Sequence, residues 1–293
     1  MSGNKKDSKE LLALVRLLDD PNEKVFSKVK EQIFLYGSDA IPALENAWEN
    51  SFDDTIQQRS LNIIHEIQFE NTYLDLNKWS YFQFDDLLSG YIIVTRYNYP
   101  DLDSTKIITQ TAKIIQDVWL ELNNNLTGLE KIKVINHVFF DLFHFRNNKK
   151  NFYATENFFL NNLLETKVGN PISLGLLYLI VCRSLKIPVY GVNLPNHFVL
   201  AYVDEISILN SKVEKDDVLF YLNPFNKGKV FTKNEIDLFV KQMKLEPNDN
   251  YYVPCDNKTI IHRLLEDMIL AYTKLGYDDK IAELKKLLEA VQI

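Results

Sequence analysis

Three side chains in the second half of the chain are of the types that nucleophilic catalysis uses, and their order suits such a site. Ser173 lies in the first turn of an expected helix, His197 directly precedes an expected strand, and Asn223 ends a later one. A nucleophile gains acidity at a helix N-terminus, a His can accept its proton, and an Asn or Asp can orient the His. The candidate catalytic set is therefore His197, Asn223 and Ser173.

A helix over about 171–185 must position the first member of this set. Asn170 followed by Pro171 indicates a helix start, because Asn can accept a first-turn N–H and proline has no donor to leave unpaired there. Apolar residues then cover nearly every face of the helix, which predicts a buried, central element. Strand-like runs over 187–194, 198–203 and 218–222 predict an antiparallel sheet beside it.

The cysteine that papain- and transglutaminase-type enzymes place at this helix start is missing. Cys182 lies roughly 16 Å further along the helix axis, at about 1.5 Å per residue, and cannot replace it. Ser173 is the only hydroxyl in the first turn, but a Ser at the third helical position commonly bonds its own turn. Asn157, Asn170 and Pro171 are expected to form the cleft in front of the helix, with Asn157 fixing the preceding loop.

Several motifs in this region resemble one known family. The run G-N-P-I-S-L-x-L-L-Y-L with R-x-L-x-I-P, then P-N-H-F and L-N-P-F-N-x-G, resembles the transglutaminase-like core family of the bacterial SirB-type regulators, which also occurs in an F-box protein. The run Y-x-Y-P-D-L-D at 97–103 fits the same pattern. The resemblance covers about residues 85–290.

This resemblance assigns expected roles to individual positions. It places Pro171 where an active transglutaminase has its cysteine, His197 at the histidine and Asn223 at the acid. Lys186 and Asn196 stand where the family usually has glycine; Asn tolerates the left-handed backbone of such a turn better than Lys does. The absent cysteine makes catalysis the less favoured interpretation.

The predicted fold class is α+β, with a transglutaminase- or papain-like core, in which the buried helix packs on an antiparallel sheet, and helical extensions at both ends. Apolar residues at helical spacing near the N-terminus, with an echo between 20–33 and 54–64, resemble HEAT-type repeats, although an ordinary helical bundle is the alternative. The expected division is a disordered segment over 1–8, a helical HEAT-like segment over 9–80, the core over 85–245 and a C-terminal helix pair over 258–293.

Composition argues against several functions. The net charge is −7 and the pI near 5.4, so the surface is expected to repel nucleic-acid phosphates, and the sequence reveals no compensating basic patch. Two cysteines are too few for a disulfide framework, and no signal peptide or membrane span is recognisable, which favours a cytoplasmic protein. His137 and His144 could share a helix face, but without further ligands we expect packing there and neither a metal nor a cofactor.

Two function classes remain open. The first is a non-catalytic, transglutaminase-like protein that acts as a polypeptide-binding or regulatory module, with neither nucleic acid nor a membrane as its partner. The second is a hydrolase or acyl transferase that uses His197 and Asn223 with Ser173 or a cysteine from elsewhere. The missing nucleophile favours the first.

Overall fold

The structure is a computed structural model that describes residues 3–195, 197–205, 207, 213–246 and 248–292. The chain divides into two compact units, residues 1–75 and 76–293. The long helix α4 (Asp54–Phe82) runs through the point at which the units divide. Among the described helices, none is both long enough and apolar enough to cross a membrane.

The smaller unit is helical, as expected. It contains α1 (Gly3–Arg16), α2 (Glu23–Phe34), α3 (Ile41–Asn50) and the first part of α4. Residues 3–8 belong to α1, so the expectation of a disordered N-terminal segment does not agree with the structure there, and residues 1–2 lie outside the described part. The helices enclose a core of aliphatic side chains: Leu11, Val15, Leu18, Val29, Ile33, Ala40, Leu44, Ile63, Ile64 and Ile67.

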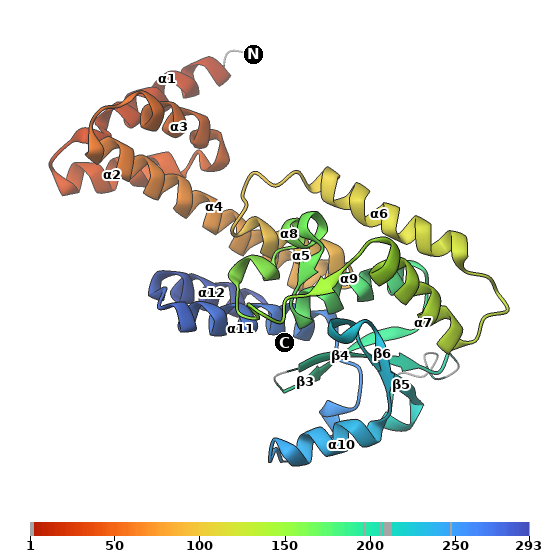
Figure 1. The fold of residues 1–293 in the computed structure, drawn as a ribbon. Helices are drawn as coiled ribbons and strands as arrows, with labels where there is room; N and C mark the ends of the chain where they lie inside the picture. Colours follow the sequence, from red (N-terminus) through yellow and green to blue (C-terminus); the bar gives the residue numbers. More distant parts are fainter. Residues whose placement is uncertain (1–2, 196, 206, 208–212, 247, 293) are drawn as a thin grey trace. The chain divides into compact units, whose positions relative to one another are not determined.

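The larger unit has the predicted α+β architecture (Figure 1). Its central helix begins with the predicted cap and is buried from Pro171 through Cys182. A π-helical turn, His137–Leu142, extends the helix expected at 129–143. The helices are α5 (Leu87–Arg96), α6 (Ser104–Glu121), α7 (Gly128–Asn136), α8 (Leu160–Thr166), α9 (Pro171–Ser184), α10 (Lys233–Gln242), α11 (Asn257–Leu275) and α12 (Asp278–Ala290).

The sheet is antiparallel, with the strand order β3-β4-β5-β6. Its strands are β3 (Val189–Leu194), β4 (His197–Val203), β5 (Val218–Asn223) and β6 (Lys229–Phe231). The first three were predicted, although β4 already begins at the histidine; the expected role of Asn196 in the preceding turn lies outside the described residues. Strand β6 and a parallel pair, β1 (Arg146–Asn147) with β2 (Val168–Gly169), are too short to leave a period-two pattern and were not predicted.

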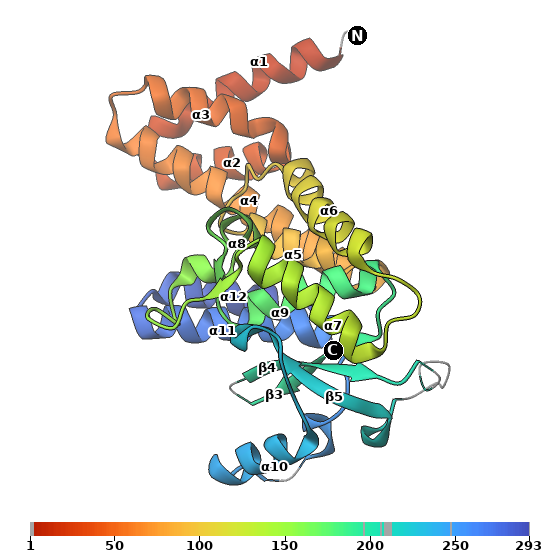
Figure 2. The same cartoon turned by 45° about the vertical axis from the view of Figure 1, so that its right-hand side comes forward.

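Helices cover both faces of this sheet (Figure 2). On one face α9 approaches so closely that a Cβ on Gly175 would lie 2.6 Å from the ring of Phe198. On the other face Val199 and its neighbours pack against α10. A capping box of Thr232 with Glu235 starts α10, as their spacing predicted.

The C-terminal helix pair is part of the larger unit. Helix α11 contacts β3 and α5, and it packs against α12 after a left-handed turn at Gly276. The Tyr97 hydroxyl of α5's C-cap donates to Glu283 of α12 at 2.7 Å. The helical pair at the C-terminal end of the chain therefore packs against the core.

Lysines occupy left-handed backbone positions after three helices of this unit. Lys167 follows α8, Lys186 follows α9 and Lys244 follows α10, with φ angles of 61°, 55° and 53°. A fourth, Lys227, has a φ of 52° in the turn between β5 and β6. The position at which the sequence has Lys186 in place of the family's usual glycine does adopt the conformation that glycine favours.

Replacement of Gly228 by alanine should destabilise the protein more than the same change at Gly276. Both have positive φ, but a Cβ on Gly228 would lie 1.9 Å from Oδ1 of Asn136, whereas nothing lies within 4 Å of one on Gly276. The Asn136 amide bridges the Gly228 carbonyl and the Tyr178 hydroxyl, so its displacement breaks two hydrogen bonds. We expect Gly276→Ala to lower the free energy of unfolding by about 1 kcal/mol and Gly228→Ala by at least about 2 kcal/mol more.

Urea denaturation of both variants measures this difference. Equal losses would show that the contact between α7 and the β5–β6 turn contributes nothing beyond the backbone conformation.

Candidate functional site

A small cleft lies over the N-terminus of α9, with a volume of about 180 Å³. Asn170 and Pro171 line it, and one charged pair, Arg263 with Asp267, reaches into it from α11. The remaining lining, which together with these residues we call the α9 cleft, is apolar and mostly aromatic: Phe152, Tyr153, Phe158, Phe198, Met243 and Leu270.

The N-terminus of α9 presents no free nucleophilic side chain to this cleft. The Ser173 side chain is fully buried; its backbone N–H donates to Asn170 Oδ1 at 2.9 Å, and its Oγ accepts from the Asn170 N–H at 3.0 Å. The same Oγ donates back to the Asn170 carbonyl. The hydroxyl is therefore used in the helix cap and is not presented to the cleft, while Pro171, at the nucleophile position, offers neither thiol nor hydroxyl.

His197 lies outside the cleft lining. It opens β4, pairs with Leu194 in the hairpin, and shares a sheet face with Val199, two residues on. That face is covered by α10, and the imidazole makes an edge contact with Phe239, at 4.8 Å between ring centroids. Partial desolvation, with the positive charge of Arg263 as a second cause, lowers the pKa of His197 below its usual value.

Asn223 ends β5 on the same face of the sheet as His197. Extending the β4–β5 register by one residue places it opposite Val199, diagonal to the histidine, and such diagonal positions are about 7–8 Å apart. Its Oδ1 is buried and has no hydrogen-bond partner among the described residues. The structure thus brings His197 and Asn223 to one face without a hydrogen bond between them, and leaves Ser173 and Pro171 at α9, on the opposite face.

The residues that the sequence did not single out are Arg263 and Asp267. Arg263 Nε donates to Asp267 Oδ1 at 2.8 Å, and its Nη1 donates to Asn193 Oδ1 at 2.9 Å. Burial raises the pKa of Asp267, and the adjacent guanidinium opposes that rise. The i,i+4 spacing of opposite charges on α11 was the available signal, but such pairs are usually solvent-exposed and carry no functional implication.

Asn157, which was expected to form the cleft, is not among the residues that line it and instead holds the loop before α9. The Asn157 Nδ2 donates to the Asn151 carbonyl at 2.9 Å, while its Oδ1 accepts from Asn148 Nδ2. Among the described residues no group of His, Cys, Asp and Glu is arranged to hold a metal ion. The ring of His137 instead lies beside Asp141, at 3.2 Å.

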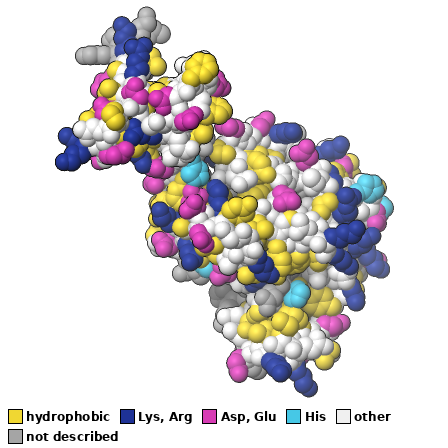
Figure 3. All heavy atoms as spheres, turned by 60° about the vertical axis from the view of Figure 1, so that its left-hand side comes forward, with side chains coloured by type: hydrophobic (Ala, Val, Ile, Leu, Met, Phe, Trp, Pro, Cys, Tyr) yellow, Lys and Arg dark blue, Asp and Glu magenta, His cyan; other side chains and the backbone are white. Residues whose placement is uncertain are grey.

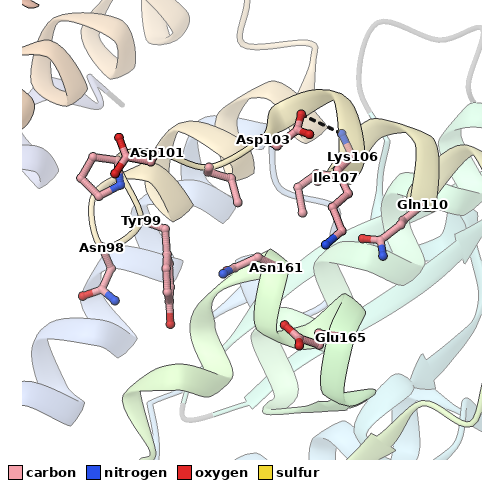
Figure 4. A pocket seen from close by; sticks show the side chains of 11 residues that line it. Asn98, Tyr99, Asp101, Asp103, Lys106, Ile107, Gln110, Asn161 and Glu165 are labelled. Carbon is pink, nitrogen blue, oxygen red and sulfur yellow. Dashed lines mark hydrogen bonds between the residues drawn. The ribbon is translucent and has the colours of Figure 1, made fainter. Parts of the chain in front are cut away.

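A second, more open hollow of about 560 Å³ lies between the end of α5, the start of α6 and α8 (Figure 4). The Y-P-D-L-D motif at 99–103 lines it, and Asp103 caps α6 by accepting from the Lys106 N–H at 3.1 Å. Lys106, Gln110 and Asn161 point toward the same space. Sequence reasoning did not predict this hollow, and none of the predicted site residues lines it.

Comparison with known proteins decides the family. The model of the transglutaminase-like superfamily matches residues 105–266, more than half of the chain. The chain belongs to the transglutaminase-like superfamily. The match begins in α6 and ends in α11, so it includes α9, the whole sheet and Arg263, and it confirms the resemblance and the fold class expected from the sequence motifs.

Relatives within this superfamily are distant. A UPF0162 protein of Xylella fastidiosa is 26% identical over 207 residues, which cover 67% of this chain and 68% of the relative. A UPF0162 protein of Vibrio cholerae is 24% identical over 61% of this chain and 64% of its own length. The F-box only protein 21 of Mus musculus is 27% identical over 54% of this chain but only 24% of the relative. No solved structure matches the chain significantly.

Native-state thiol labelling should be slow at both cysteines and slowest at Cys182. The Cys182 side chain is fully buried, and burial raises the pKa of its thiol. Burial raises the pKa of Cys255 to about 12, and its Sγ donates to the Gly191 carbonyl. Maleimide labelling followed by mass spectrometry, with a urea-denatured sample as the control, measures both rates. Rapid labelling of Cys182 would contradict the central position of α9.

The imidazole of His197 should titrate below about 6.5, its ordinary pKa, and Arg263→Gln should move that pKa upward. Because the unfolded chain binds this proton more readily, the group favours folding above about pH 6.5 and loses that contribution as the pH falls toward its folded pKa. NMR titration of the ring resonances measures the shift, with Arg59→Gln, in the other unit, as the control. A pKa that is unchanged by Arg263→Gln would show that burial alone depresses it.

Proposed function

We propose that this chain is a non-catalytic member of the transglutaminase-like superfamily and that it binds a polypeptide segment in the α9 cleft. The observation that supports this proposal most strongly is the set of residues at the N-terminus of α9. Pro171 occupies the nucleophile position, and the one hydroxyl in the first turn of α9, that of Ser173, is enclosed in a two-way cap with Asn170. Without a nucleophile, a base has no group to activate.

The location of His197 supports the same proposal. Its ring contacts Phe239 on the α10 side of the sheet, whereas the N-terminus of α9 lies on the other side. The groups that reach into the cleft from α11 are Arg263, a permanent cation that cannot accept a proton, and Asp267, whose carboxylate accepts a hydrogen bond from that guanidinium. The cleft therefore has groups that can orient a ligand, but its lining offers no activated thiol or hydroxyl to attack one.

The size and lining of the cleft favour a side chain of a polypeptide as its occupant. Its volume of about 180 Å³ is below the roughly 300–1,000 Å³ typical of small-molecule pockets. Aromatic walls suit an apolar side chain, while Arg263 and Asp267 can pair with backbone carbonyl and N–H groups beside it. A peptide can thus anchor one residue here and extend across the surface.

A second candidate is a hydrolase or acyl transferase that uses His197 and Asn223. The observation in its favour is the buried Oδ1 of Asn223, which lacks a partner and lies diagonal to His197 in the sheet. A rotation of the imidazole toward Asn223 would complete that pair, but a nucleophile would still have to come from another residue.

We further propose that residues 9–80 form HEAT-like repeats that contribute a second contact surface for the partner. Two helical hairpins around one aliphatic core fit such repeats. The two free cysteines, Cys182 and Cys255, fit a reducing compartment, and we retain the cytoplasm as the proposed location.

Activity-based labelling tests the absence of catalysis. Incubation of the wild type with serine-directed fluorophosphonate and cysteine-directed epoxide probes should give no labelling above that of the denatured protein, because neither Pro171 nor Ser173 offers an activated nucleophile. His197→Ala and Ser173→Ala should give the same background, and an active cysteine protease serves as the positive control. Stoichiometric labelling of the wild type that both variants abolish would overturn the proposal and identify Ser173 as the nucleophile.

A further inference from the structure

Positive charge gathers on one surface of the larger unit, although the whole chain carries a net charge of −7. Figure 3 shows Lys and Arg side chains collected along one edge of that unit with few acidic side chains among them. Contacts between four segments bring together six cationic residues, and we call the surface that they form the basic face: Lys113, Arg146, Lys149, Lys150, Lys167 and Lys227.

The short strands and turns hold these segments together. The Arg146 N–H donates to the Lys167 carbonyl at 2.8 Å, within the β1–β2 pair. The Asn147 side chain, one residue further on, donates to the Phe225 carbonyl at 2.6 Å and so fixes the turn that carries Lys227. Helix α6 contributes Lys113. Burial lowers the pKa of Lys167, and the positive charge of Lys113 lowers it further. Lys113 and Lys167 are thus close enough to interact.

Carboxylates do not neutralise this surface. Within the described residues none of the six side chains forms a salt bridge, whereas Lys131 pairs with Glu205 and Lys233 with Asp237 elsewhere in the unit. The Lys167 ammonium lies over the rings of Phe145 and Phe143, at 4.9 and 5.8 Å from their centroids, and donates to a backbone carbonyl. The other five side chains are exposed. Like charges left unpaired on a compact surface repel one another, so an anionic partner would stabilise them.

The basic face ends where the α9 cleft begins. Lys149 and Lys150 precede Phe152 by only a few residues, and Phe152 lines the cleft. The ring of Phe152 also makes an edge contact with Phe225 at 5.8 Å, beside the turn of Lys227. A chain that leaves the cleft over Phe152 therefore passes directly onto the cations.

We propose that the α9 cleft and the basic face bind one acidic polypeptide segment, with an apolar side chain in the cleft and Asp or Glu residues of the flanking chain on the basic face. This inference rests on the proposed function and adds the chemistry of the partner. Surface pairs of this kind contribute modestly one by one, but together they attract and orient an acidic chain.

Several observations favour a polypeptide over a nucleic acid. Bases stack on open aromatic faces, but Phe152 makes edge contacts with Tyr153 and Phe225, and Lys274 covers the ring of Tyr153. The net negative charge of the chain also opposes a long polyanion beyond the six cations. A short acidic peptide can bind to the basic face alone and need not approach the negatively charged remainder of the chain.

Selection from a random-peptide phage library on the immobilised full-length protein tests this inference. Wild-type binders should carry an apolar residue with Asp or Glu enriched within a few positions of it. The triple variant Lys149→Glu, Lys150→Glu, Lys227→Glu should lose that enrichment and bind the selected acidic peptides at least about 10-fold more weakly at roughly 0.1 M salt. The control is Lys106→Glu, Lys285→Glu, Lys286→Glu, which has the same charge change at exposed positions of α6 and α12, outside the cleft and the basic face, and should bind within about twofold of the wild type.

The possible outcomes separate the two proposals. Selected peptides that are apolar without acidic enrichment, and that bind the triple variant as well as the wild type, overturn the acidic partner but leave the cleft as a polypeptide site. An absence of selected peptides overturns both. Tighter binding of labelled oligouridylate than of any acidic peptide, if lost in the triple variant, assigns the basic face to nucleic acid and also overturns this inference.

Discussion

The larger unit depends on the complete burial of one helix. Every residue of α9 from Pro171 to Cys182 is enclosed, and an element that is apolar on all sides can be stable only when others cover each side of it. The sheet covers one side, with Gly175 permitting the close approach of Phe198, and α5, α6 and α8 contact the others. The position of the helix start, and of the cleft above it, follows from this enclosure.

Enclosure also explains why the site has a cap in place of a nucleophile. A buried helix start needs its free N–H groups satisfied by side chains, because water is excluded. The reciprocal bonds of Asn170 and Ser173 meet that requirement and leave the hydroxyl no freedom to act on a ligand. Within this superfamily fold the helix start is thus satisfied by its own first-turn side chains.

The sequence predicted the helices and strands whose caps and apolar patterns depend on residues close together in the chain. The cap at Asn170 and Pro171, the capping box at Thr232 and the apolar runs of the first three strands each depend on residues close in the chain. The two-residue strands and β6 carry no such signal. The side of the sheet that His197 occupies depends on register, since a shift of one residue exchanges the faces. The basic face was missed because its cations come from segments that only tertiary structure joins.

The left-handed lysines have a thermodynamic consequence that reaches beyond the individual turns. Each of Lys167, Lys186 and Lys244 stands at a helix C-terminus with a backbone strain of roughly 1 kcal/mol. A cation there interacts with the partial negative charge of the helix end, which offsets about 0.3–1 kcal/mol at low ionic strength. That offset is screened by salt, whereas the steric strain is not. The ends of α8, α9 and α10 are therefore more stable at low ionic strength. As the salt concentration rises, lysine becomes a less favourable residue at these left-handed positions.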